Sequence, residues 1–165
     1  MAMPAAPTNV EFGDAVALSR DGQRLAVGGP NASGNTLPGT VHVYQWSGTA
    51  WTQLGAAIPG KAAGDNGGDA VALSADGARV AIASPGNRDA LPGSTGNQTG
   101  QVRVFQWSGS AWTQLGGDMN GVAQVNGERL GEALSLSADG TRLIASGANL
   151  SHARVFVLQN GAWAQ

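Results

Sequence analysis

The sequence predicts an all-β fold, and three observations support this prediction. A related line of residues occurs three times, as FGDAVALSRDGQRLAVGGP at 12–30, GGDAVALSADGARVAIASP at 67–85 and LGEALSLSADGTRLIASGA at 130–148. Apolar and polar residues alternate with the two-residue period of strands between frequent turn residues, and no segment keeps the periodicity of a helix. Repeats of this length are supersecondary units, which must stack to bury their apolar faces.

The composition limits the protein classes that fit. The chain has 165 residues, enough for one domain with a real core, and its 26 glycines suit many tight turns. The net charge of -2 argues against binding to nucleic acid or to an anionic membrane surface. There is no cysteine, which excludes disulfides and thiolate chemistry. No apolar run reaches the roughly 20 residues that a membrane helix needs.

The chain divides into a short leading segment and a repeat domain. We interpret residues 1–9 as an N-terminal extension or tag remnant, because MAMPAAPTNV lacks the charged and apolar regions of a signal peptide. The repeat domain is expected to cover 10–165, with its units at about 12–60, 67–121 and 130–165.

Each unit is expected to hold four strands, of which the first is short and made of small apolar residues that suit a crowded centre. These first strands are expected at 15–18, 70–73 and 133–136. An Asp–Gly pair follows each of them, and because Asp bonds local backbone and Gly accepts positive φ, the pair closes a hairpin. The second strands are expected at 24–27, 79–83 and 142–145.

A loop of variable length joins the second strand to an alternating third strand. The third strands are expected at 41–44, 102–105 and 153–156, and the fourth begin at AWTQLG, AWTQLG and AWAQ. Three four-stranded antiparallel units stacked by repetition are typical of the blades of a β-propeller. An open β-solenoid is the alternative, but solenoid coils are usually shorter and lack this hairpin pattern.

An arginine stands three residues after each turn aspartate, at Arg24, Arg79 and Arg142. A pair that every unit repeats is expected to be structural. We interpret it as turn chemistry with an ion pair at the surface or between units.

Phe12-Gly13 followed by Gly28-Gly29-Pro30 resembles the FG-GAP repeat of integrin-α-type propellers, and the LSxDGxRxA core resembles the SPDG-type blades of bacterial propellers. The resemblance implies a propeller and an extracellular or cell-surface location. Integrin-type blades carry a calcium loop of the DxDxDG kind, whereas the turns here hold one carboxylate each. Because calcium takes six or more oxygen ligands, no metal is expected, and no cofactor is expected either.

Closed propellers usually hold 4–8 blades, so three blades would leave two apolar faces open. We expect a homodimer with six blades, because two-fold symmetry is the commonest in oligomers. A trimer with nine blades is the second arrangement. The third is that these blades belong to a larger chain.

An acidic residue precedes each first strand, at Asp14, Asp69 and Glu132. In a ring these carboxylates would surround one mouth of the central channel and could hold a cation or a cationic ligand. The structural alternative is that each accepts backbone N–H groups or pairs with a neighbouring arginine.

Aromatic residues and loop residues are the other candidates for binding. Trp46 and Trp107 could stack on sugar rings, while Trp51, Trp112 and Trp163 recur in all units and are expected to pack blade on blade. The loops after the second strands contribute six further candidates: Asn31, Asn35, Asn87, Arg88, Asp89 and Asn97.

Catalysis finds little support in the sequence, and the chain is not expected to be an enzyme. His42 and His152 have neither a nucleophile motif nor zinc-ligand spacing. The predicted function is a non-catalytic binding or adhesion scaffold for a protein surface or a carbohydrate. The alternatives are a self-assembling structural module without a ligand and an enzyme whose site lies between chains.

Overall fold

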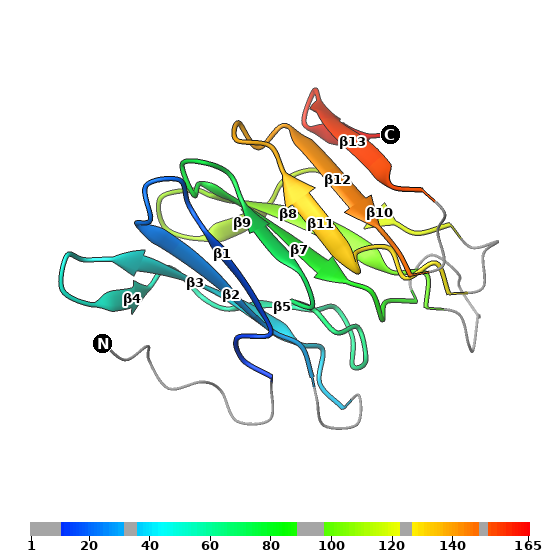
Figure 1. Cartoon of the computed structure of the whole chain (residues 1–165), viewed down its shortest axis with the longest axis horizontal. Coiled ribbons are helices and arrows are strands. Elements are labelled where there is room, and N and C mark those ends of the chain that lie inside the picture. The colour runs from blue at the N-terminus through cyan, green and yellow to red at the C-terminus, as the bar shows by residue number, and fades with distance from the viewer. Residues whose placement is uncertain (1–10, 32–35, 89–97, 123–126, 149–151) are drawn as a thin grey trace.

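The computed structural model describes residues 11–31, 36–88, 98–122, 127–148 and 152–165, and it shows antiparallel β-sheets side by side (Figure 1). This confirms the predicted all-β class. Within these ranges there is no helix, and hence none long and apolar enough to cross a membrane. The predicted extension at 1–9 lies outside the described residues.

Each repeat unit forms one sheet, and in each the strands follow one another in chain order. The first sheet contains β1 (Ala15–Leu18), β2 (Arg24–Gly29), β3 (Thr40–Trp46), β4 (Trp51–Gln53) and β5 (Ile58–Pro59). The second contains β6 (Val71–Leu73), β7 (Arg79–Ser84), β8 (Gln101–Trp107), β9 (Trp112–Gln114) and β10 (Met119–Asn120). The third contains β11 (Ala133–Leu136), β12 (Arg142–Ser146), β13 (Arg154–Gln159) and β14 (Ala162–Ala164).

The prediction of four strands per unit missed β5 and β10. Each is a two-residue strand that pairs with the start of the third strand of its sheet, as Val41 with Ile58 and Val102 with Met119. β4 and β9 pair with the other half of the same third strands, so the fourth position in each sheet is shared by two short segments. Two residues are too few to show an alternating pattern in the sequence.

The Asp–Gly hairpins form as predicted, and a serine completes each one. The Ser19 hydroxyl donates to Asp21 Oδ1 at 2.6 Å, and the Arg24 N–H donates back to the Ser19 hydroxyl at 2.9 Å. Ser74–Asp76 and Ser137–Asp139 repeat the arrangement, at 2.6 and 2.5 Å. The glycine of each pair has φ between 65° and 68°. Local chemistry alone therefore fixes the three turns.

These turn aspartates predict a pH dependence of stability. The Ser137 hydroxyl and the Thr141 N–H and hydroxyl lower the pKa of Asp139 from 3.8 to about 2. A lowered pKa contributes stability that is present above pH 3.8 and is lost as pH falls through about 2. Asp139→Asn should therefore unfold at lower urea than the parent at pH 7, with the difference closing near pH 2. A difference that stays constant with pH would contradict this account.

The core lies between the sheets. Ala26, Val41 and Val43 of the first sheet pack with Val80, Ile82 and Phe105 of the second. A second cluster repeats this packing between the second and third sheets, around Val102, Val104, Leu143 and Phe156. β1 lies beside β6, and β6 beside β11, so the sheets converge along their first strands. The small residues predicted there permit this close approach.

Hydrogen bonds that repeat from unit to unit also join each sheet to the next. Nη1 of Arg24 donates to the carbonyl of Gly77 at 3.0 Å, and that of Arg79 donates to Gly140 at 2.9 Å. The N–H of Arg20 donates to the carbonyl of Ala75, and the N–H of Ala75 donates to that of Ala138, both at 2.9 Å. Arg24 and Arg79 are structural and reach the neighbouring unit, but the bond that each makes across this border goes to a backbone carbonyl instead of the predicted carboxylate.

The recurring tryptophans also link neighbouring sheets. The indole N–H of Trp112 donates to the carbonyl of Leu54, and that of Trp163 donates to Leu115, each at 2.8 Å. The predicted packing of unit against unit is confirmed for these two residues. A buried indole usually finds such a partner. The same side chain therefore buries apolar area between the sheets and is held in one orientation by its hydrogen bond.

Candidate functional site

The three acidic residues that precede the first strands occupy the same position in three equivalent turns. The N–H of Asp14 donates to the carbonyl of Glu11, and the N–H of Asp69 donates to that of Asn66, at 3.1 and 3.2 Å. Glu132 repeats this bond to Arg129 at 3.3 Å. The glycine before each acid has φ between 95° and 108°, which favours glycine. The repeat therefore places one carboxyl at the same end of each first strand.

The carboxyl of the middle unit, Asp69, responds to the charges of the other acids. Burial raises the pKa of Asp69 above 3.8, and the charges of Glu132, Asp14 and Glu11 raise it further, while Arg129 lowers it. Asp69 is half-buried and belongs to the middle unit, whereas Asp14 and Glu132 are exposed on either side. A carboxyl with a raised pKa among like charges is suited to exchanging a proton.

Arg129 completes this group, which we call the acidic row: Glu11, Asp14, Asp69, Glu132 and Arg129. Arg129 Nε donates to Glu132 Oε1, and its Nη1 donates to Gln98 Oε1 at 2.8 Å. A guanidinium has five N–H donors, so these two bonds leave donors for an oxyanion. Sequence reasoning missed Glu11 and Arg129, although both stand three residues before a predicted acid.

The acidic row can exchange protons and bind anions through one cation, but it is not arranged as a metal centre. Among the described residues, no three His, Cys, Asp or Glu side chains come together in a way that could hold a metal ion. The chemistry that fits is general acid–base catalysis beside a guanidinium.

Trp46 and Trp107, predicted to stack on sugars, instead form pairs within their own sheets. Trp46 lies 5.4 Å from Trp51, and Trp107 lies 5.3 Å from Trp112, measured between ring centroids. Both are half-buried. Trp107 also lies against Gly55 of the first sheet, where a Cβ would approach its ring to 2.7 Å. This pair belongs to the packing between sheets.

Of the six predicted loop residues, the structure describes three, and two of these have buried side chains. Asn87 is completely buried, and its amide donates to Asp65 Oδ2 at 3.1 Å. Asn31 is also buried and its amide lies 3.4 Å from the carbonyl of Leu37. A ligand outside the fold cannot reach Asn87, because its side chain is part of the interior. Arg88 is exposed, and Asn35, Asp89 and Asn97 lie outside the described residues.

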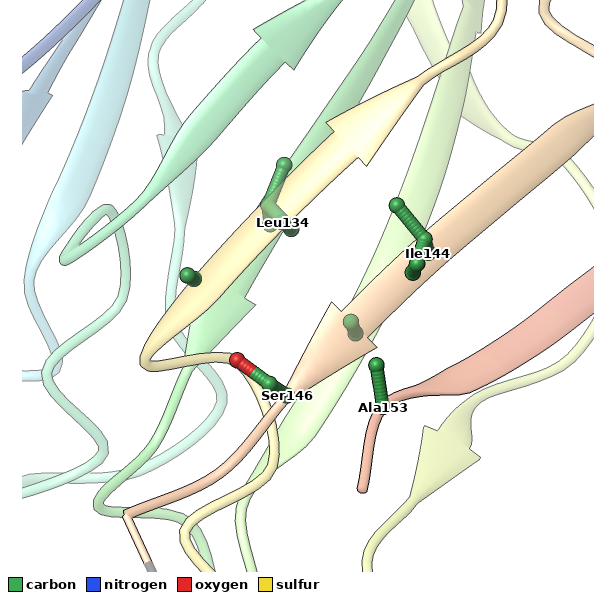
Figure 2. Close-up of a pocket in the computed structure, with 6 residues that line it drawn as sticks. Leu134, Ile144, Ser146 and Ala153 are labelled. Carbon is green, nitrogen blue, oxygen red and sulfur yellow. The ribbon is translucent and has the colours of Figure 1, made fainter. Parts of the chain in front are cut away.

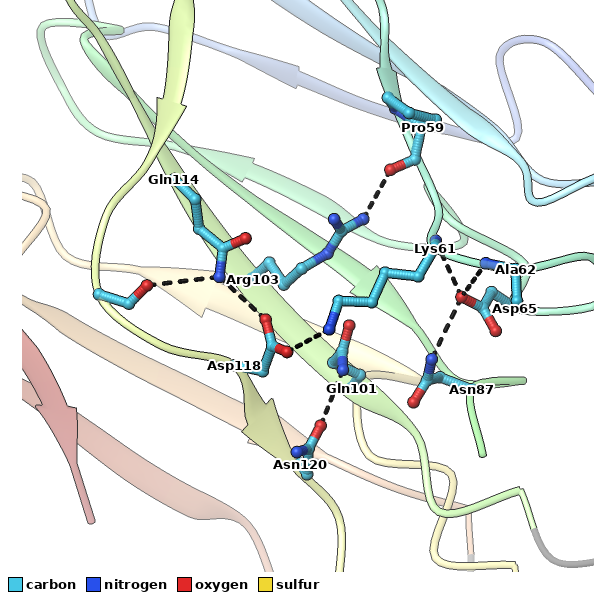
Figure 3. A network of polar contacts seen from close by, with 11 residues as sticks. Pro59, Lys61, Ala62, Asp65, Asn87, Gln101, Arg103, Gln114, Asp118 and Asn120 are labelled. Atoms are coloured by element: carbon cyan, nitrogen blue, oxygen red, sulfur yellow. Dashed lines mark hydrogen bonds and ion pairs between the residues drawn. The ribbon is translucent and has the colours of Figure 1, made fainter. Parts of the chain in front are cut away.

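A polar network that the sequence did not reveal holds the connection between the first and second sheets (Figure 3). Asp65 Oδ2 accepts the N–H groups of Lys61 and Ala62, both at 2.9 Å, besides the Asn87 amide. Nη2 of Arg103 donates to the carbonyl of Pro59 at 2.7 Å. All these partners belong to the protein itself, so we assign the network to structure.

Glu128 takes the place of Asp65 in the next connection. Its carboxylate accepts the N–H of Val122 and pairs with Nη1 of Arg154 at 3.2 Å. The Glu128 side chain is completely buried and that of Arg154 is 11% exposed. Each of the two acids stands four residues before a predicted acid, Asp65 before Asp69 and Glu128 before Glu132, so the repeat itself marks their position.

Comparison with known proteins shows the fold. No protein-family model and no curated protein matches the chain. The chain is similar over 90% of its length to a candidate 6-phosphogluconolactonase from Bacteroides fragilis NCTC 9343, with a TM-score of 0.57 and 13% identity. It is similar over 99% to a candidate 6-phosphogluconolactonase from Bacteroides uniformis ATCC 8492, with a TM-score of 0.56 and 16% identity.

A third neighbour is the periplasmic gluconolactonase of Pseudomonas aeruginosa, with a TM-score of 0.54 and 24% identity over 90% of the chain. The chain spans 36%, 43% and 38% of the length of these three proteins. They are propeller-type proteins, so the antiparallel sheets of this chain have a propeller-type arrangement.

These neighbours correct four predictions. The assignment to the FG-GAP family is wrong, because the similar structures carry lactonase names and no family model matches. The predicted adhesion or carbohydrate-binding scaffold, its ligand-free structural alternative and the prediction that the chain is not an enzyme are overturned by the same lactonase names. The FG-GAP resemblance failed because its short glycine motifs reflect tight turns, which unrelated propellers share.

Proposed function

We propose that this chain contributes three blades to a closed propeller that hydrolyses a sugar lactone at the acidic row. The observation that carries the proposal is the half-buried Asp69: burial and the charges of neighbouring carboxylates raise its pKa, and the charge of Arg129 acts on it in the opposite direction. The blades are residues 12–60, 67–121 and 130–165 of a domain that covers 10–165. The lactonase names of three structural neighbours support the reaction class.

Asp69 would act as the general base and then as the general acid. Its carboxylate takes a proton from a water molecule, whose oxygen forms a bond to the lactone carbonyl carbon. The bond between this carbon and the ring oxygen then breaks, and Asp69 returns the proton to the ring oxygen. The product is the open hydroxy acid, and the raised pKa makes Asp69 a stronger base than an ordinary carboxylate.

Arg129 would stabilise the negative charge that develops on the carbonyl oxygen. Its bonds to Glu132 and Gln98 hold the guanidinium in place before the substrate arrives. Fixed donors aimed at a developing oxyanion lower the barrier, because no reorganisation is needed during the reaction. Glu132 is therefore a positioning residue for Arg129, and Asp14 raises the pKa of Asp69.

The acidic row would lie at one mouth of the central channel, because the first strands converge and each acid stands at the same end of its strand. The ring is completed outside this set of three blades. The name of the Pseudomonas aeruginosa neighbour, a periplasmic enzyme, supports a location outside the cytoplasm.

Asp69→Asn should lower kcat for gluconolactone hydrolysis by about 100-fold or more, because loss of a general base typically costs 10²–10⁴-fold. Rates are measured against spontaneous hydrolysis with a pH indicator in weak buffer. In the parent, kcat should rise with pH through the raised pKa of Asp69. Asp118→Asn is the control, because Asp118 pairs with Lys61 in another part of the fold. Parent rates equal to the spontaneous rate would overturn the proposal.

Asp69→Asn should also change the free energy of unfolding. Because the pKa of Asp69 is raised on folding, its contribution is favourable below pH 3.8 and is lost as pH rises through the raised value. Asp69→Asn should therefore unfold at higher urea than the parent at pH 7, with the gain closing toward pH 3. A variant less stable than the parent at pH 7 would show that Asp69 serves the fold.

A further inference from the structure

We propose that a second copy of this chain closes the propeller, with the outer face of its first sheet seated on the outer face of the third. This inference rests on the ring arrangement of the proposed function. Two kinds of contact already join the first sheet to the second and the second to the third: an arginine side chain that bonds the glycine carbonyl of the next turn, and a backbone N–H that bonds a carbonyl of the next sheet. For each contact, the acceptor on the first sheet and the donor on the third sheet have no partner within the described residues.

The unused arginine is on the third sheet. Arg24 and Arg79 each donate to the glycine carbonyl of the next Asp–Gly turn, whereas the guanidinium of Arg142 donates no hydrogen bond within the described residues. The unused glycine is on the first sheet. A Cβ at Gly77 or Gly140 would meet the arginine of the preceding sheet at 2.6 Å, whereas one at Gly22 would meet nothing within 4 Å of the described structure.

The backbone repeats this pattern. The N–H groups of Arg20 and Ala75 donate to the equivalent residue of the next sheet, and Ala138, next in this series, donates to no acceptor among the described residues. The carbonyl of Arg20, first in the series, accepts no bond from them. A donor at one end of the chain thus matches an acceptor at the other.

The apolar pair that each sheet offers to the next is exposed only on the third. The cross-strand pairs Ala26–Val43 and Ala81–Val104 are buried, whereas their equivalents Ile144 and Val155 are 44% and 49% exposed. Figure 2 shows Ile144 beside Leu134 at a hollow of about 200 Å³ with an apolar lining. An exposed apolar surface beside unused hydrogen-bonding groups indicates an interface.

On the outer face of the first sheet, Val27 and Tyr44 are already buried in the single copy, so the matching exposed apolar residues lie on its first strand. Val16 and Leu18 are 64% and 60% exposed, and their equivalents in the second sheet, Val71 and Leu73, pack into the core shared with the first sheet. Two copies related by a two-fold axis make this junction twice. Six blades then close the ring, within the 4–8 that propellers usually hold.

The solution mass of the 165-residue chain tests the inference. By light scattering after size exclusion, we expect twice the 16.5 kDa of one chain. Val155→Lys should give a folded monomer, because this side chain is exposed in the single copy. Val122→Lys, at another valine that is 48% exposed, should remain a dimer.

Arg142→Ala separates the junction between copies from the junctions within one. It should raise the dimer dissociation constant about 100-fold or more, because the variant removes a hydrogen bond to a charged group at both junctions and each such bond contributes about tenfold or more. Arg79→Ala should instead lower the stability of each copy, because Arg79 links the second sheet to the third.

A 16.5 kDa parent at high concentration, a trimer, or a dimer that survives Val155→Lys would overturn the inference. If the chain is a monomer, its open faces would be covered by something other than a second copy, such as further blades of a longer chain. Gluconolactone hydrolysis is measured on the same samples. A dimer without hydrolysis keeps this inference and contradicts the proposed function, whereas a monomer that hydrolyses the lactone does the reverse.

Discussion

Replacing Glu128 with alanine is expected to lower the free energy of unfolding by about 3–5 kcal/mol, the usual cost of breaking a buried ion pair from one side. The Glu128 side chain is completely buried between the N–H of Val122 and the guanidinium of Arg154. Its removal leaves a largely buried arginine side chain without its carboxylate and a backbone donor without its acceptor. Urea unfolding followed by tryptophan fluorescence measures the loss.

Two variants locate the origin of this effect. Glu128→Gln keeps an acceptor for the Val122 N–H but removes the charge that faces Arg154, so its loss should fall between those of the parent and the alanine variant. Asp118→Ala breaks the ion pair with Lys61, whose side chains are 23% and 36% exposed, and should cost less than about 1 kcal/mol. Equal losses for Glu128→Ala and Asp118→Ala would show that burial of the pair is unimportant.

Gly28→Ala should cost about 3 kcal/mol, the upper part of the usual range for overpacking a core. Gly28 lies in β2, and a Cβ there would stand 2.0 Å from the carbonyl oxygen of Gly68 in the neighbouring turn. That oxygen is backbone, so no side chain can turn away to make room. Relief requires the first and second sheets to separate, and their shared core would lose contacts.

Gly117→Ala is the matched control for this substitution. Gly117 is exposed, and a Cβ there would meet nothing within 4 Å of the described structure. Its φ lies outside the positive range, so alanine can adopt the same backbone. We expect a change within about 0.5 kcal/mol, as is usual for surface substitutions. A similar loss at both glycines would indicate a general effect of alanine instead of the close approach of two sheets.

The sequence predicted those features of the fold that neighbouring residues determine. The Ser–x–Asp–Gly turns form within a few residues, and β1 and β11 run from Ala15 to Leu18 and from Ala133 to Leu136 as expected. Contacts between units were harder to predict. The packing of Trp112 and Trp163 could be expected from their recurrence, but the carbonyl that Arg24 selects depends on how far the next sheet reaches.

The candidate site was predicted in part. Repetition identified Asp14, Asp69 and Glu132, because each follows the same glycine turn. It could not identify Arg129, since the equivalent residues are Glu11 and Asn66 and the pattern changes with the unit. The burial of Asn87 could not be predicted either, because its partner Asp65 belongs to the connection before the sheet. A loop composition rich in asparagine is the same whether the side chains face solvent or the interior.

The contact between Arg24 and Gly77 is repeated between Arg79 and Gly140. Because every junction uses the same contact, this protein could gain or lose one whole unit at a time. A unit gained or lost by gene duplication or deletion brings its own arginine and its own glycine carbonyl, so both of its borders match without any compensating substitution. The number of units can change in one genetic event, while the chemistry of their junction remains the same.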